Sequence, residues 1–116
     1  MEKPLVWMGQ TLKDLRKMPE AVKDEFGYAL GVAQRGGVAA SARPMKANLR
    51  DVIEVVTDED GDTYRAMYTT RLEGRVYVLD VFQKKAKSGR GTPKADLDRI
   101  ALRLTAARKL HRDNPP

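Results

Sequence analysis

Apolar and polar residues alternate along two neighbouring stretches in the middle of the chain, Tyr64–Leu72 and Val76–Phe82. Alternation with a period of two residues predicts β-strands that bury one face. Glu73 and Gly74 lie between the two stretches, and a glycine in a two-residue connection supplies the positive φ that tight hairpin turns need. The pattern therefore predicts a β-hairpin whose turn is Glu73-Gly74.

This turn would fix which residues lie opposite each other in the hairpin. The predicted opposite pairs are Arg65 and Phe82, Met67 and Asp80, Thr69 and Val78, and Leu72 and Arg75. The more apolar face, predicted to be the core face, carries Tyr64, Ala66, Tyr68, Tyr77, Leu79 and Val81. The other face, predicted to be open to solvent, carries Arg65, Met67, Thr69, Arg71, Asp80, Phe82 and Lys84.

Three further segments have the spacing and end signals of amphipathic helices. The first extends to Met18 after Thr11, a residue suited to the N-cap; the second begins near Pro19 and ends at Gly36-Gly37; the third begins with Thr92-Pro93 as N-cap and first residue. The predicted buried stripes are Val22, Phe26, Ala29, Leu30 and Ala33 in the second helix, and Leu97, Ile100, Ala101, Leu104 and Ala107 in the third. Surface positions of the third helix are assigned to Asp96, Asp98, Arg99 and Arg103, and a packing position near its end to His111.

Two shorter strands complete the predicted sheet, at Leu5–Met8 and Asp51–Val56. Residues 38–48 are small and have no clear period, so they are predicted to form a loop. The acidic run Thr57–Asp62 is interpreted as a polar turn built on Asp60-Gly61, because it lacks the ligand spacing of a calcium-binding EF-hand loop.

The length of 116 residues is that of one domain, spanning 1–116. The predicted fold is α+β, with an antiparallel or mixed sheet of about four strands, two N-terminal helices packed on one face and a C-terminal helix. Because the chain has no cysteine and one histidine, we expect no metal and no cofactor. The apolar run Leu5–Met8 is too short for a signal sequence or a membrane span, which predicts a cytoplasmic protein with no membrane partner.

The amount and the position of positive charge indicate the kind of partner. The net charge of +6 favours an acidic ligand, and the segment Lys84–Lys94 gathers cations with no acid before Asp96. Cations that continue from the solvent face of a sheet suit a phosphate backbone, and Phe82 on that face can stack a base. The candidate RNA-binding residues are Lys46, Arg71, Phe82, Lys85, Lys87, Arg90 and Lys94.

The same face has the residue types for RNA cleavage without a metal, in which the substrate's own 2′-OH is the nucleophile. Such a site must orient the RNA backbone, stabilise charge on the phosphate and assist proton transfer. Arginine grips phosphate oxygens with two N–H groups and keeps its charge, which suits Arg65 to the first two tasks. Lys84 lies beside further lysines and is suited either to donate a proton or to hold the phosphate.

The element order, together with YRxxY at 64–68 and FxKKxxxxxxTP at 82–93, resembles the phage Gp49-like or HigB-type branch of the RelE toxin superfamily. The resemblance extends from Val6-Trp7 to the last helix. It implies the toxin of a type II toxin–antitoxin system, a ribosome-dependent, metal-independent mRNA endonuclease. Its implied partners are the ribosome, mRNA and a helix-turn-helix antitoxin encoded beside it.

By this resemblance Arg65 corresponds to the arginine that engages the scissile phosphate, and Lys84 to a second catalytic cation. The chain departs from the pattern at Glu54 and Val56, where many relatives carry basic residues, and no histidine or tyrosine follows Lys84. Two non-catalytic functions also explain the charge: a ParE-like gyrase inhibitor and a simple RNA-binding module.

Overall fold

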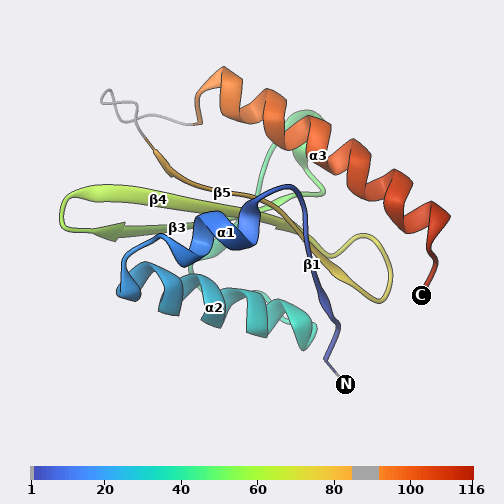
Figure 1. Ribbon diagram of the computed structural model, residues 1–116, viewed down its shortest axis with the longest axis horizontal. Helices are drawn as coiled ribbons and strands as arrows, with labels where there is room; N and C mark the ends of the chain where they lie inside the picture. Colours follow the sequence, from blue (N-terminus) through green and yellow to red (C-terminus); the bar gives the residue numbers. More distant parts are fainter. Residues whose placement is uncertain (1, 85–91) are drawn as a thin grey trace.

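A five-stranded mixed sheet forms the middle layer of the computed structural model, which describes residues 2–84 and 92–116 (Figure 1). β1 runs parallel to β5, and the other neighbouring strands are antiparallel. The predicted α+β class and mixed sheet are confirmed, with five strands in place of about four. Across the sheet the strands are β1 (Leu5–Trp7), β5 (Val76–Lys84), β4 (Asp62–Thr69), β3 (Ile53–Glu59) and β2 (Ala42–Pro44).

The additional strand, β2, lies in the segment 38–48 that the sequence predicted to be a loop, and the 3₁₀ helix η1 (Ala47–Leu49) begins there. Both elements are three residues long, too short for a periodic pattern. β2 is a strand because Arg43 pairs with Glu54 of β3, a contact that local sequence does not encode.

Helices cover both faces of the sheet, and Figure 1 shows α2 and α3 on its opposite sides. α1 (Thr11–Arg16) and α2 (Glu20–Gln34) pack on one face, where the predicted buried stripe of α2 is confirmed. α3 (Lys94–Asp113) packs Ile100, Leu104 and Ala107 onto the other face. The hairpin face that was predicted to be open to solvent is therefore a second core face.

A β-bulge changes the register in the middle of the hairpin. Arg65 pairs with Phe82 and Met67 with Asp80 as predicted, but Tyr68 pairs with Val78 and Thr69 with Tyr77. Leu79 is left as the extra residue of β5. Tyr77 and Leu79 consequently lie under α3, on the opposite face from Tyr64 and Tyr68, where the sequence had placed all of them together.

The hairpin between β3 and β4 is longer than the sequence suggested. β3 continues through the acidic run to Glu59, and only Asp60 and Gly61 form the turn, with φ of 52° and 81°. Both angles are positive, as a two-residue primed turn requires. Most of the predicted polar turn Thr57–Asp62 is therefore strand.

Two threonines predicted as helix N-caps do not act as caps. Thr11 is the first residue of α1, and its buried hydroxyl has no hydrogen-bond partner within the described residues. Thr92 precedes Pro93, the N-cap residue of α3, and its hydroxyl bonds to side chains of the sheet instead. Within residues 2–84 and 92–116, none of the helices has both the length and the apolar character to cross a membrane.

Candidate nucleic-acid interface

Arg65 lines a cavity of about 680 Å³ between the β2–η1 segment and the beginning of α3. Apolar side chains form part of its wall: Met45, Leu49, Leu97 and Ala101. The charged groups of the lining are the cations Arg43, Lys46, Arg65 and Lys94 and the acids Glu54 and Asp98. A cavity with apolar walls and a cationic majority fits a nucleotide, whose base is apolar on its faces and whose phosphate is an anion.

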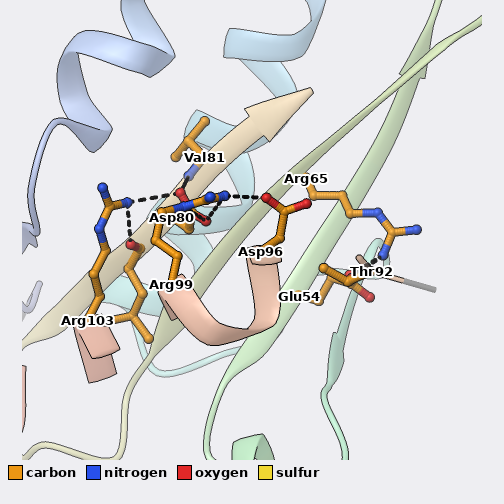
Figure 2. Close-up of polar contacts among 9 residues, drawn as sticks. Glu54, Arg65, Asp80, Val81, Thr92, Asp96, Arg99 and Arg103 are labelled. Atoms are coloured by element: carbon orange, nitrogen blue, oxygen red, sulfur yellow. Dashed lines mark hydrogen bonds and ion pairs between the residues drawn. The ribbon is translucent and has the colours of Figure 1, made fainter. Parts of the chain in front are cut away.

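Arg65 is held by one side chain from β3 and one from the segment just before α3 (Figure 2). Its Nη1 donates to Glu54 Oε2 at 2.5 Å and to Thr92 Oγ1 at 2.9 Å, and Thr92 Oγ1 lies 3.3 Å from the same Glu54 oxygen. The Arg65 side chain is only 11% exposed and that of Glu54 20%. The expectation that the Arg65 side chain is open to solvent is therefore wrong, because α3 and the residues just before it cover this face of the sheet.

The sheet register explains how Glu54 reaches Arg65. Val56 of β3 lies directly opposite Arg65 of β4, and Glu54 lies two residues before Val56 on β3. Residues two apart on a strand point to the same face, so Glu54 and Arg65 are diagonal neighbours within reach of long side chains. The sequence offered one signal for this contact: Glu54 is an acid at a position where many relatives carry a basic residue, and an acid there can pair with Arg65.

Lys84 is the last residue of β5 and lies opposite Thr63. Because Phe82 lies opposite Arg65, this register places Lys84 and Arg65 on the same face of the sheet, in diagonal positions. The catalytic roles of Arg65 and Lys84 remain predictions. Lys85, Lys87 and Arg90, predicted to bind RNA, lie outside the described residues.

Phe82 lines a second cavity, of about 790 Å³, together with residues of α1 and with Arg99 and Arg103 of α3. The Arg99 guanidinium carbon lies 5.4 Å from the centre of the Phe82 ring, so this ring face already has a cation stacked over it. Although Arg65 and Phe82 lie opposite each other in the hairpin, they line different cavities on two sides of α3. The sequence placed Arg65 and Phe82 together on one open face of the hairpin. Their separation into two cavities was not predicted.

A buried carboxylate anchors α3 to the sheet. Asp80 of β5 accepts hydrogen bonds from Arg99 Nε and Arg103 Nη1, both at 2.9 Å, and from the backbone N–H of Val81 at 3.1 Å (Figure 2). Burial acts to lower the pKa of Arg99, but hydrogen bonds to Asp80 and Asp96 raise it overall. Arg99 and Arg103, predicted to make only surface pairs, thus fasten the helix to the sheet.

The other candidate RNA contacts are dispersed. Lys46 and Lys94 both line the cavity of Arg65, although Lys94 also pairs with Asp98 at 3.0 Å. Arg71 follows the end of β4, is exposed, and has Asp51 3.9 Å away. The described lining of the Arg65 cavity does not include Arg71.

The sequence of the chain decides its family. The family model "Phage derived protein Gp49-like (DUF891)" matches residues 13–105, which is most of the chain. The chain belongs to the Gp49-like family. No curated protein sequence matches this Gp49-like chain significantly.

Comparison with solved structures identifies the fold. E. coli toxin RelE, as a double arginine-to-alanine mutant in the free state, has a TM-score of 0.63 with the Gp49-like chain at 18% identity, covering 90% of this chain and 99% of the toxin. The toxin–antitoxin complex RelBE2 from Mycobacterium tuberculosis gives a TM-score of 0.49 at 19% identity, covering 71% of this chain and 98% of the other. The first of these likenesses shows that the Gp49-like chain has the RelE fold. The family and fold implied by the sequence motifs are confirmed.

Proposed function

We propose that this Gp49-like protein is the toxin of a type II toxin–antitoxin pair, of the HigB type, and that it cleaves mRNA on the ribosome without a metal ion. The observation that carries the proposal is the position of Arg65: in a protein with the RelE fold, it lines a cavity that also holds Arg43, Lys46 and Lys94. A single buried arginine surrounded by further cations suits the scissile phosphate and its neighbours.

In this mechanism Arg65 binds the phosphate whose ester bond breaks. The substrate displaces Glu54 or Thr92 from Nη1, and the guanidinium then stabilises the charge that develops on the phosphate oxygens. Lys84, on the same face of the sheet, holds a neighbouring phosphate or protonates the leaving oxygen. The apolar wall around Leu97 and Ala101 excludes water from the nucleotide.

The proposed partner is a helix-turn-helix antitoxin encoded by the adjacent gene, and the proposed site of action is the cytoplasm. An acidic or amphipathic antitoxin segment that covers the cationic cavity would block access of mRNA to Arg65. Co-expression of the adjacent open reading frame is expected to relieve growth arrest. Arrest that the neighbour leaves unrelieved contradicts the antitoxin assignment.

Mapping mRNA 5′ ends after induced expression tests the activity. New ends within translated codons are expected from the wild type and, because lysine lacks the two-pronged grip of arginine, far fewer from Arg65→Lys. Arg35→Lys is the matched control, since Arg35 is an exposed residue at the end of α2, which packs on the opposite face of the sheet. Intact transcripts with gyrase-dependent DNA damage would favour a ParE-like inhibitor instead, and intact transcripts without damage an RNA-binding module.

A further inference from the structure

The closest partner of Arg65 is a carboxylate that also lines the cavity. Glu54 Oε2 lies 2.5 Å from Arg65 Nη1, and the Glu54 side chain remains 20% exposed. We propose that Glu54 is the general base that takes the proton from the attacking 2′-OH. This inference rests on the endonuclease function proposed above and assigns a catalytic role to a residue on β3.

The geometry favours this role because one short contact joins the two groups that the reaction needs. In RNA the 2′-OH lies on the ribose that carries the scissile phosphate, so a phosphate bound by Arg65 brings its 2′-OH into the same cavity. A general base must reach within about 2.6–3.2 Å of the oxygen that it deprotonates. A carboxylate already in contact with the phosphate-binding guanidinium needs little movement to reach that oxygen.

The charges favour proton transfer only after substrate binds. In the free protein the negative charge of Glu54 is compensated by Arg65 and by the Thr92 hydroxyl. When an anionic phosphate takes hydrogen bonds from Arg65, the carboxylate loses part of this compensation and is free to accept a hydrogen bond from the 2′-OH. The same displacement therefore binds the phosphate and activates the base.

The step balances within the residues and RNA named here. The 2′-OH transfers its proton to a Glu54 carboxylate oxygen while the 2′-oxygen forms a bond to phosphorus. The bond between phosphorus and the 5′-oxygen breaks, and this oxygen takes a proton from the Lys84 ammonium group or from water. The products are a 2′,3′-cyclic phosphate and a 5′-hydroxyl end, and Glu54 returns its proton to solvent.

Replacing Glu54 with glutamine separates this role from a positioning role. A glutamine amide oxygen still accepts a hydrogen bond from Arg65, but it does not take up a proton at neutral pH. Single-turnover cleavage of a defined mRNA on programmed ribosomes is expected to be about 10²–10⁴-fold slower for Glu54→Gln. Binding of the same mRNA is expected to be unchanged or tighter, since one negative charge is removed from a phosphate site.

Two further measurements complete the test. Glu54→Asp keeps a carboxylate and is expected to retain more activity than Glu54→Gln. The wild-type rate is expected to fall as acid protonates the base, and this fall is expected to be absent from the residual rate of Glu54→Gln. The matched control is Glu59→Gln, which removes the same charge from the end of the same strand, outside the described lining of the cavity.

Wild-type cleavage accompanied by an equally fast Glu54→Gln variant would overturn the base assignment and leave the endonuclease proposal standing. If Glu54→Gln fails to fold, the wild-type pH profile and Glu54→Asp decide: a rate that does not fall with acid, or an aspartate variant that folds but is inactive at every pH, overturns the assignment. Wild-type protein that leaves mRNA intact on translating ribosomes overturns both proposals.

Discussion

Two buried polar side chains on β4 differ in how well the fold satisfies them. Arg65 Nη1 donates to a carboxylate and a hydroxyl, whereas its Nε is buried without a hydrogen-bond partner in the described residues. The Tyr68 hydroxyl, three residues later and on the other face, has no hydrogen-bond partner in the described part of the chain. Since Arg65 makes an ion pair and a hydrogen bond through Nη1, whereas the Tyr68 hydroxyl makes neither, the two residues are expected to respond to truncation in opposite directions.

Replacing Arg65 with alanine is expected to lower the free energy of unfolding by about 2 kcal/mol. This value lies between the cost of losing an exposed ion pair, at most about 1 kcal/mol, and that of breaking a buried pair, about 3–5 kcal/mol, because both side chains keep some exposure. Urea unfolding measures it, with Arg65→Lys as the control that retains the charge. A change below about 0.5 kcal/mol would mean that the Glu54 pair contributes little to stability.

Replacing Tyr68 with phenylalanine is expected to raise the free energy of unfolding by about 1 kcal/mol, because it removes a buried hydroxyl that makes no hydrogen bond. Tyr77→Phe is the matched control: the Tyr77 hydroxyl lies 2.8 Å from His111 Nδ1, so this variant is expected to lose about 1 kcal/mol. Denaturant melts of both variants give the comparison. A loss at Tyr68 as large as that at Tyr77 would show that its hydroxyl is satisfied in solution.

The dependence of stability on alkaline pH gives an independent measurement at Tyr68 and at its neighbour Tyr64. Burial raises the pKa of Tyr68, and burial followed by the charges of Asp62, Asp60 and Glu59 raises that of Tyr64. A raised pKa favours the protonated form in the folded state, so the stabilisation is complete below the unfolded tyrosine pKa of about 10 and is lost as pH rises through the folded values. Stability is therefore expected to fall above about pH 10, and to fall less steeply in Tyr68→Phe.

At the scale of elements, the features that the sequence did not predict depend on where α3 packs on the sheet. The turn at Glu73-Gly74 and the buried stripe of α2 were predictable because local residue types and spacing specify them, although β4 already ends at Thr69 and not at the predicted Leu72. The bulge at Leu79, the Thr92 contact and the role of Arg99 were not, because each depends on where α3 meets the sheet. Arg65 was predicted as a site residue from its motif, whereas its burial followed from the position of a helix that begins 29 residues later (94 − 65).

The attachment of α3 is expected to depend on Asp80. Asp80→Asn is expected to lower the free energy of unfolding by about 3 kcal/mol, since it leaves Arg99 and Arg103 without their shared carboxylate. Hydrogen exchange of the α3 amides is expected to speed up most. Asp98→Asn is the control, because the exposed pair of Asp98 with Lys94 contributes at most about 0.5 kcal/mol. Equal effects of the two substitutions would contradict the anchoring role.

At the scale of the whole molecule, the cavity is assembled from distant parts of the chain. Arg43 belongs to β2 and Lys46 directly precedes η1. Arg65 belongs to β4, and Lys94 is the first residue of α3. The net charge of +6 attracts any polyanion, and this arrangement concentrates four of the described cations around one space. Charge count was readable from composition; the convergence of Lys46 and Lys94 on Arg65 required the fold.

RNA binding is expected to weaken with salt in proportion to the phosphates contacted. For single strands, the slope of log affinity against log salt is about −0.7 per phosphate, so Lys46→Ala is expected to make the slope less negative by about 0.7. Lys23→Ala, on α2 and beyond the opposite face of the sheet, is expected to leave it unchanged. Titrations of a single-stranded RNA at several salt concentrations measure both. Equal slopes for Lys46→Ala and wild type would remove Lys46 from the interface.

The parallel pairing of β1 with β5 also sets an order of events during synthesis. Leu5 pairs with Val76, so β1, once translated, waits for a partner 71 residues later (76 − 5). At about 5–20 residues per second this interval lasts about 4–14 s. The cavity around Arg65 waits longer still, because Thr92, Leu97 and Ala101 line it. A nascent chain therefore carries an incomplete sheet until β5 has been translated, and its cavity stays incomplete until the beginning of α3 has followed.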